Sequence, residues 1–262
     1  GVPHEMKDML ERAVIPDLKR RSGDPSVIVS RTLRTWGESE SGLNERLDPV
    51  IHRLEEAGNP TLAFLASGWE GIKVRLTARA PDRAGALALI EPYEADIRAE
   101  LGSQVFGTDD DTMESVVLDL MRSRGLTLGL AESVTGGLVG ARITGIAGAS
   151  DVLRGSIVSY ASQVKFEVLG VPEGPVVNEP TAVAMAVGAR RVLGSDVGLA
   201  LTGVAGPSEQ DGMPVGTLCI GLVMPDAEPI STTVRLPGQR QQMREFSVIS
   251  ALDLLRRTLP AG

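Results

Sequence analysis

The segment Glu132-Ser-Val-Thr-Gly-Gly137 could carry chemistry, because it joins an apolar strand pattern to a helical one. A serine at such a turn lies beside free backbone N–H groups, which suits either anion binding or a nucleophile. Ser133, Thr135 and Gly136 are therefore candidate site residues. Helix capping explains the same residue types equally well, since Ser and Thr are common N-caps and paired glycines are common in turns.

A second cluster, Ser159-Tyr-Ala-Ser-Gln-Val-Lys165, offers a base for that serine. Both histidines of the chain lie in its first quarter, so a Ser-His-Asp triad within the second half is excluded. A lysine in a desolvated pocket can have its pKa lowered enough to accept a proton near neutrality. A lone lysine after a strand is more often solvated surface, so the interest of Lys165 depends on Ser133. Tyr160 belongs either to the core or to the site.

A third cluster, Thr202-Gly-Val-Ala-Gly-Pro207, is a small-residue turn after another apolar strand pattern. Its glycines expose N–H groups that could form an oxyanion hole or a phosphate cradle, which makes Thr202 and Gly203 candidates. Taken alone, it is better explained as an ordinary strand-end turn. Ser150 adds one more hydroxyl beside a glycine turn, and Cys219 is expected to be a small buried apolar residue.

The fourth cluster, Pro237-Gly-Gln-Arg-Gln-Gln-Met-Arg244, opens the last helical pattern. Arginines in a first helical turn oppose the helix dipole, so Arg240 and Arg244 weakly indicate an anionic ligand. A solvated helix face remains slightly favoured from the sequence alone.

Composition narrows the class of protein. The chain has 262 residues, a formal net charge of -8 and a single cysteine. The acidic balance argues against a primary nucleic-acid partner, which needs a basic surface. No run approaches the ~18 apolar residues of a membrane span, and no signal peptide is visible. The single cysteine excludes an internal disulfide and fits a cytoplasmic location, and the scarcity of Cys and His predicts no metal site.

The first part of the chain predicts a small α+β domain. Residues 1–24 are helical, with Pro16 expected to end or kink the helix, and 21–25 form a linker. A domain at 26–107 has the order β-α-β-β-α-β. Its elements are strands at 27–33, 61–66, 72–80 and 104–106 and helices at 42–57 and 82–101. Gly68-Trp-Glu-Gly71 has the letters of a GxxG loop but lies in a hairpin rather than between helices, so nucleic-acid binding by it is disfavoured.

The second part, residues 108–262, predicts a three-layer α/β/α domain with a mixed sheet. Strands and helices follow one another, and the last two strands form an antiparallel pair. The expected strands are 126–131, 155–160, 197–201, 215–223 and 230–236, and the expected helices are 112–124, 136–144, 179–193 and 240–259. In open α/β sheets ligands bind where strands end, which is where the four clusters fall.

Eight different short motifs follow one another within roughly residues 113–258. They are Ala131-Glu-Ser-Val-Thr-Gly-Gly137, Gly148-Ala-Ser150, Gly155…Tyr160…Lys165, Leu169-Gly-Val171, Glu179-Pro-Thr-Ala182, Thr202-Gly-Val-Ala-Gly-Pro207, Pro214-Val-Gly-Thr217 and Gly238-Gln-Arg240…Arg244. Together they resemble the C-terminal domain of the CinA family, the nicotinamide-nucleotide amidohydrolase or PncC-like domain. Upstream, the small α+β domain resembles the KH-like domain of full-length CinA proteins. Residues 1–25 look like the tail of a preceding molybdopterin-binding-like domain and a linker. The resemblance assigns pyrophosphatase activity to that preceding domain in some members, so none is expected of these 262 residues.

The resemblance implies deamidation of nicotinamide mononucleotide to nicotinic acid mononucleotide and ammonia, with no cofactor. Ser133 would be the nucleophile and Lys165 the general base, with Ser150 and Tyr160 as relay or orienting groups. Backbone N–H groups near Ser133 or at Thr202-Gly203 would stabilise the oxyanion. Arg240 or Arg244 would hold the 5′-phosphate, since a guanidinium fork matches phosphate geometry.

Two segments depart from the family's pattern. Tyr160-Ala-Ser-Gln163 stands where Tyr-Ser-Asn-Glu is common, and Val177-Asn-Glu179 stands where Val-Ser-Glu is common. Ser133 and Lys165 are unaffected by these departures. The family's habit also implies a homodimer. The alternative function is a nucleotide-binding, competence-related regulatory module without useful catalysis.

Overall fold

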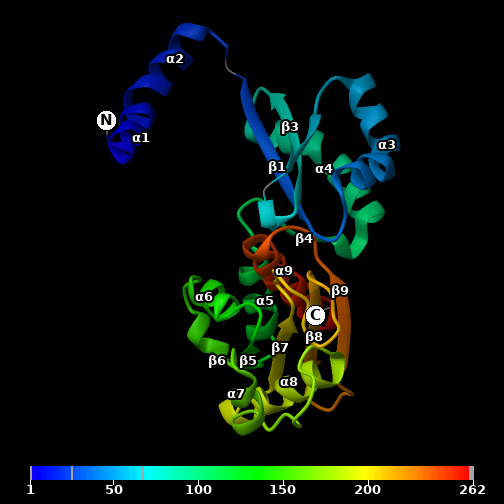
Figure 1. The fold of residues 1–262 in the computed structure, drawn as a ribbon. Coiled ribbons are helices and arrows are strands. Elements are labelled where there is room, and N and C mark those ends of the chain that lie inside the picture. Colours follow the sequence, from blue (N-terminus) through cyan, green and yellow to red (C-terminus); the bar gives the residue numbers. More distant parts are fainter. Residues whose placement is uncertain (1, 25, 67, 260–262) are drawn as a thin grey trace. The chain divides into compact units, whose positions relative to one another are not determined.

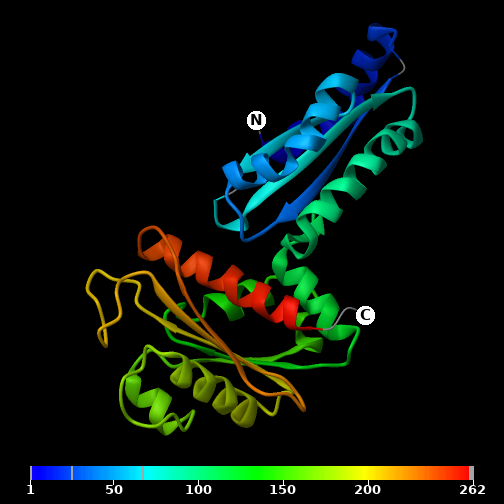
Figure 2. The ribbon, with the colours of Figure 1, turned by 90° about the vertical axis from the view of Figure 1, so that its right-hand side faces the viewer.

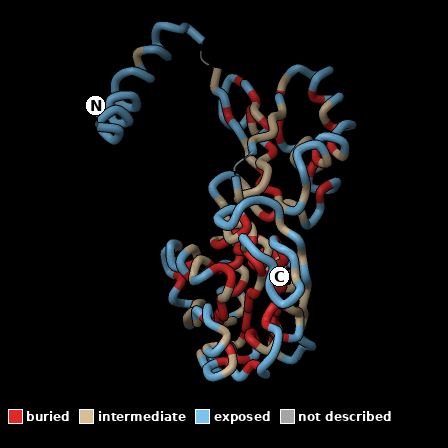
Figure 3. Tube along the Cα trace, in the orientation of Figure 1, coloured by how far each residue is buried: buried red, intermediate tan, exposed pale blue. Residues whose placement is uncertain are grey.

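The computed structural model describes residues 2–24, 26–66 and 68–259. The chain divides into two compact units, Gly1–Ala66 with Ile72–Asp109 and Ser67–Gly71 with Asp110–Gly262 (Figure 1). Each unit has its own set of buried residues along the chain trace (Figure 3). No helix in the described ranges combines the length and apolar character needed to span a membrane.

The N-terminal segment is helical, as predicted. It consists of α1 (Pro3–Met9), a π-helical turn (Leu10–Val14) and α2 (Ile15–Ser22). Pro16 does not end the helix. It lies in the first turn of α2, directly after the π turn, where the N–H that proline lacks is not needed for an α-helical hydrogen bond.

The first unit has the predicted β-α-β-β-α-β order. Its elements are β1 (Val27–Thr35), α3 (Glu40–Ala57), β2 (Thr61–Ala66), β3 (Ile72–Ala80), α4 (Arg83–Leu101) and β4 (Val105–Thr108). The strands form an antiparallel sheet in the order β2-β3-β1-β4. The helices bury one face of this sheet through residues such as Leu33, Leu47 and Leu76. The Gly68–Glu70 segment is a short 3₁₀ turn between β2 and β3, so the GxxG letters do lie in a hairpin.

The second unit is built on a five-stranded mixed sheet, as predicted. Its strands are β5 (Leu128–Glu132), β6 (Leu153–Val158), β7 (Val197–Gly203), β8 (Thr217–Val223) and β9 (Ile230–Arg235). They lie in the order β6-β5-β7-β8-β9. The pairs of β5 with β6 and β7 are parallel, and β8 pairs antiparallel with both β7 and β9.

Helices cover both faces of this sheet and complete the three layers (Figure 2). One face carries α5 (Met113–Arg122), α6 (Leu138–Thr144) and α9 (Arg240–Thr258), and the other carries α7 (Ser162–Glu167) and α8 (Glu179–Leu193). Glycines let α8 lie close to the strands. A Cβ on Gly198 or Gly221 would come within 2.1 Å and 2.3 Å of the α8 backbone, so any larger residue would push the helix away.

Helix α7 is the one described helix of this unit that the sequence pattern did not predict. Its six residues are too few for a 3.6-residue periodicity to stand out. A lysine after a strand also looks like solvated surface. In the structure Lys165 lies on this helix and is buried.

Candidate active site

A cavity of about 150 Å³ opens where β5 and β7 end. From β5 the chain turns to β6 on one side, and from β7 it turns to β8 on the other, so the cavity lies at the point where the connections diverge. It is polar and is walled by residues from five separate segments. These residues are Ser133, Val134, Tyr160, Ser162, Lys165, Val176, Val177, Thr202, Gly203, Val204, Ala205, Gly206, Ser208, Gln210 and Arg240.

The turn that carries Ser133 is fixed by the buried carboxylate of Glu132 at the end of β5. Glu132 is fully buried and accepts four hydrogen bonds. Its donors are Thr135 Oγ1 at 2.8 Å, Val139 N at 2.9 Å, Gly140 N at 2.8 Å and Ser156 Oγ at 2.7 Å. Ser133 N also donates to Leu201 O of β7, at 2.9 Å. These bonds tie the turn to both neighbouring strands and leave the half-buried Ser133 side chain on the cavity wall.

The two glycines of this turn are required by its geometry. Gly136 and Gly137 have φ of 59° and 92°, where a side chain is disfavoured. Gly137 is the N-cap of α6 and offers no side chain, so Glu132 supplies the capping carboxylate from the strand instead. Helix capping and the placement of Ser133 are therefore two results of one arrangement.

Lys165 reaches the same cavity from α7. Its side chain is 1% exposed, and its Nζ donates to Ser159 O at 2.6 Å. Burial lowers the pKa of Lys165 below its usual range, and the negative charge of Asp211 partly opposes that effect on the pKa. Because a buried ammonium is disfavoured, the amine is more readily available as a proton acceptor than a surface lysine would be.

Thr202 and Gly203 line the cavity at the end of β7, the strand that pairs with β5. Thr202 is buried, and its Oγ1 donates to Val176 O at 2.7 Å. A Cβ on Gly203 would lie 2.4 Å from Thr217 O, so this position admits only glycine without a shift of β8. The hydroxyl of Thr202 thus holds the Val176 segment in place along the cavity.

The two arginines of α9 have different neighbours. Arg240 lines the cavity, donates to Gly206 O at 2.9 Å and hydrogen-bonds the hydroxyl of Tyr160. Arg244 donates to Thr135 O at 2.7 Å and is not part of the cavity wall. Arg240 is therefore the guanidinium on the cavity wall, and Arg244 supports the turn that carries Ser133.

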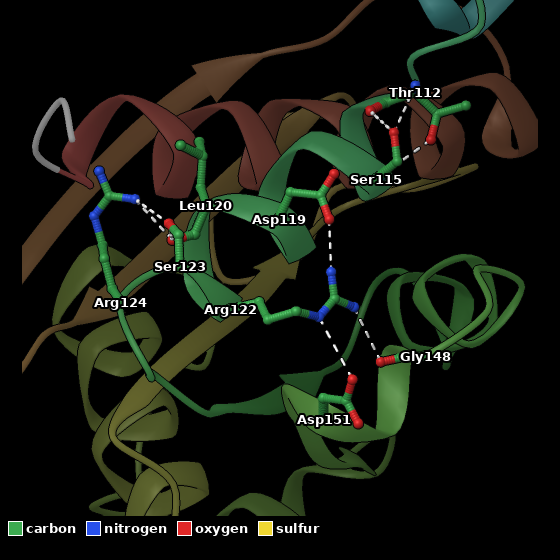
Figure 4. A network of polar contacts seen from close by, with 9 residues as sticks. All are labelled: Thr112, Ser115, Asp119, Leu120, Arg122, Ser123, Arg124, Gly148 and Asp151. Carbon is green, nitrogen blue, oxygen red and sulfur yellow. Dashed lines mark hydrogen bonds and ion pairs between the residues drawn. The ribbon is translucent and has the colours of Figure 1, made fainter.

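Besides Arg244, three candidates from the sequence do not line the cavity. Thr135 and Gly136 belong to the Ser133 turn but are not part of the cavity wall, and the Thr135 hydroxyl is bound to Glu132. Ser150 is exposed in a 3₁₀ turn (Ala149–Asp151). That turn is tied to α5 by Arg122, which donates to Gly148 O at 3.2 Å and pairs with Asp151 at 3.5 Å (Figure 4). Ser150 consequently has no direct place at the cavity.

Sequence reasoning missed part of the wall. Ser162, Ser208 and Gln210 contribute polar groups, and the Val176–Val177 segment is held against them. Asp211-Gly212 is a common two-residue turn signal, and it could have drawn attention to the loop between β7 and β8. Cys219 is fully buried, as expected, and burial raises the pKa of its thiol. No cluster of three or more His, Cys, Asp or Glu side chains suited to a metal ion occurs among the residues that the structure describes.

Family models match most of the chain. The model described as the CinA C-terminal domain matches residues 110–259, and the one described as the damage-inducible protein CinA KH domain matches residues 30–107. A CinA-like protein from Frankia casuarinae is 52% identical over 99% of this chain and 60% of its own length. A putative competence-damage inducible protein from Moorella thermoacetica is 39% identical over the whole of this chain and 63% of its own length. The chain thus spans somewhat under two thirds of these relatives.

Solved structures resemble a little over half of the chain. A competence or damage-inducible protein from Enterobacter asburiae is 26% identical, with a TM-score of 0.54 over 56% of this chain and 96% of its own length. A competence/damage-inducible protein from Agrobacterium tumefaciens is 29% identical, with a TM-score of 0.52 over 55% of this chain and 91% of its own length. More than nine tenths of each of these neighbours is therefore matched by a little over half of this chain.

Proposed function

From the membership of this chain in the CinA family, we propose that its second unit is a nicotinamide mononucleotide deamidase that works by a Ser-Lys mechanism. The observation that carries the proposal is the presence of Ser133 and the buried Lys165 on the wall of one cavity. A serine is a weak nucleophile at its ordinary pKa and needs a neighbouring base. Lys165 is the side chain of this cavity whose pKa is lowered.

In the proposed reaction, Ser133 Oγ attacks the carboxamide carbon and its proton passes to Lys165 Nζ. The C–N bond then breaks, and the leaving nitrogen takes that proton and departs as ammonia. Water adds to the resulting acyl-enzyme, giving the carboxylate product and restoring the Ser133 hydroxyl. The protonated amine is favoured less in the buried site than in water, so Lys165 readily returns the proton to the leaving group.

Arg240 is proposed to bind the 5′-phosphate of the nucleotide. It is a guanidinium on the cavity wall, and its hydrogen bonds to Gly206 O and Tyr160 hold it in one orientation. A guanidinium binds phosphate through two parallel hydrogen bonds, so a fixed orientation lowers the entropy lost on binding. Tyr160 is thereby proposed to orient Arg240. Backbone N–H groups of the two turns, near Ser133 and at Thr202-Gly203, are the proposed oxyanion donors.

The test is the release of ammonia from nicotinamide mononucleotide by the purified full chain and its variants. Ser133→Ala is expected to lower kcat/KM by at least about 1000-fold, and Lys165→Ala by a similar factor. Ser123→Ala is the matched control, because Ser123 is exposed and its hydroxyl is bound to Leu120 O at the end of α5. Full activity in either site variant would exclude the Ser-Lys mechanism.

The names of the relatives, CinA-like and competence-damage inducible proteins, favour a second candidate function, a nucleotide-binding regulatory module related to competence. That function predicts measurable binding of nicotinamide mononucleotide by calorimetry with no ammonia released. A cytoplasmic location, proposed from the single cysteine, and a homodimer, proposed from the family resemblance, are further proposals. The homodimer is tested by light scattering during size-exclusion chromatography.

A further inference from the structure

Asp211 lies in a tight turn at the edge of the candidate site. Gln210 and Met213 pair through two backbone hydrogen bonds, of 2.8 Å and 3.2 Å, and Gln210 lines the cavity. The two residues between them, Asp211 and Gly212, have φ of 55° and 73°, the pattern of a type I′ turn. This turn presents the exposed carboxylate of Asp211 to another segment of the chain.

That carboxylate holds the cavity wall. One oxygen, Oδ2, accepts hydrogen bonds from Val176 N at 2.7 Å and Val177 N at 3.1 Å, and both valines line the cavity. The carbonyl of Val176 is bound in turn by Thr202 Oγ1. The wall segment is therefore fixed on one side by Asp211 and on the other by the end of β7.

Asp211 also stands in the electrostatic surroundings of the buried Lys165, where its charge favours the protonated amine. The other titratable groups of the cavity are Tyr160 and Arg240, which are bound to each other. On α7 itself, the carboxylate of Glu167 is bound by Gln163. Asp211 is thus the carboxylate that acts on Lys165 while also being anchored to the cavity wall.

We propose that Asp211 is a positioning residue of the Ser-Lys site, fixing the Val176–Val177 wall through its hydrogen bonds and holding a negative charge near the Lys165 amine. The proposal rests on the proposed function for its meaning in catalysis, but its two physical effects are separate from turnover. One effect is geometric and the other is electrostatic, so two substitutions distinguish them.

Asp211→Asn removes the charge and keeps the anchor. One carboxylate oxygen accepts both hydrogen bonds, so the amide oxygen of asparagine can replace it, and asparagine tolerates the positive φ. Loss of a nearby negative charge lowers the pKa of a lysine. We expect the pKa of Lys165 to fall by about 0.2 to 0.7 pH unit, the size of an exposed ion-pair effect. The acid limb of the kcat/KM profile should move to lower pH by the same amount.

The pKa of Lys165 is to be measured without turnover, by the pH dependence of its labelling with acetic anhydride and mass spectrometry of the labelled peptide. Asp226→Asn is the matched control, because Asp226 is exposed in the turn between β8 and β9 with φ of 52° and has no part in the cavity. A shift in labelling without any deamidation would support the Asp211 proposal and remove the proposed function. Identical labelling curves for Asp211→Asn and the unchanged chain would overturn the electrostatic part.

Asp211→Gly removes both charge and anchor while suiting the positive φ. We expect KM to rise at least about threefold relative to Asp211→Asn, because the wall segment loses two hydrogen bonds. An equal KM in the two variants would overturn the geometric part.

A further test uses the unchanged chain, so it does not depend on whether a variant folds. In about 1 M salt, screening of the exposed Asp211 should lower the pKa of Lys165 in labelling, and a salt-independent value would contradict the proposal.

Discussion

Glu132 and Lys165 are two buried ionisable side chains of one domain, and their surroundings are opposite. Glu132 is fully buried with four donors around its carboxylate. Lys165 is 1% exposed and, within the described residues, makes one hydrogen bond, to Ser159 O. A buried charge with a full set of partners stabilises its surroundings, whereas one with few partners is easily neutralised. The first side chain shapes the turn of Ser133, and the second remains available to accept a proton.

The largest loss of stability is expected when the fully hydrogen-bonded carboxylate of Glu132 is changed. Glu132→Gln keeps the shape but turns one acceptor oxygen into an NH₂ group that faces donors. Breaking a buried charged network in this way costs about 3 kcal/mol or more of unfolding free energy. Urea unfolding of the full chain measures the loss. A change below about 1 kcal/mol would show that the carboxylate is not what holds the turn, and the contrast with Lys165 would disappear.

Removal of the poorly satisfied charge of Lys165 is expected to raise the free energy of unfolding instead of lowering it. Lys165→Met replaces a buried ammonium by an apolar side chain of similar length. We expect a gain of about 1 to 2 kcal/mol near pH 7, together with loss of deamidation.

The gain should depend on pH. The pKa of Lys165 is lower in the folded chain than its ordinary value of 10.5. Between these two values the unfolded chain binds more protons, so the stability of the unchanged chain rises with pH in that window. The advantage of Lys165→Met should therefore be complete below the window and disappear above pH 10.5. A constant difference from pH 7 to 11 would show that Lys165 is not desolvated.

A smaller loss of stability is expected when the uncharged hydroxyl of Thr202, which holds the Val176 segment, is removed. Thr202→Val keeps the shape of the side chain but leaves Val176 O without its 2.7 Å hydrogen bond. The expected cost is about 1 kcal/mol, well below that of Glu132→Gln, because both partners are uncharged. Urea unfolding measures both on one scale. Equal losses of unfolding free energy in Thr202→Val and Glu132→Gln would mean that the charge of Glu132 adds nothing to the stability of its turn.

The smallest effect is expected at Ser159, whose carbonyl accepts the Lys165 hydrogen bond. Its hydroxyl is buried, and no partner for it occurs among the described residues. Ser159→Ala removes an unsatisfied group, so stability should be unchanged or raised by up to about 1 kcal/mol. The Lys165 contact is made by the backbone and should persist. A loss of more than about 1 kcal/mol would show that the hydroxyl has a partner.

Most of the fold followed from sequence patterns. The helix at Glu179–Leu193 and the hairpin strands Thr61–Ala66 and Ile72–Ala80 were predicted with the bounds that the structure gives. They have strong local signals, namely an Asn cap and a Gly stop for the helix and alternation around a turn for the strands. Strand ends were less accurate, since β5 begins two residues after the predicted start and reaches Glu132. Backbone pairing across the sheet sets such ends, and local propensity does not reveal it.

The candidate site, like the fold, was predicted from the sequence only in part. Sequence motifs singled out Ser133, Lys165 and Arg240, and the structure places all three on one cavity. It also separates residues that the motifs could not distinguish, since Ser150 lies exposed on another turn and Arg244 supports the Ser133 turn from outside the cavity. Asp211 stood only in a two-residue turn signal, which did not reveal its contact with the Val176–Val177 wall, because the two meet through hydrogen bonds between residues about 35 positions apart.

The sequence by itself determined the type of fold and the family, because periodicity, turn residues and ordered motifs are local properties that the chain carries wherever it folds. Tertiary structure alone decided which charges are satisfied. Four donors gather around Glu132 from a turn, a helix and a neighbouring strand, while Lys165 is buried on a helix too short to be predicted. Burial and the number of hydrogen-bond partners depend on segments distant in the chain, and they fix whether an ionisable group holds a structure or can exchange a proton.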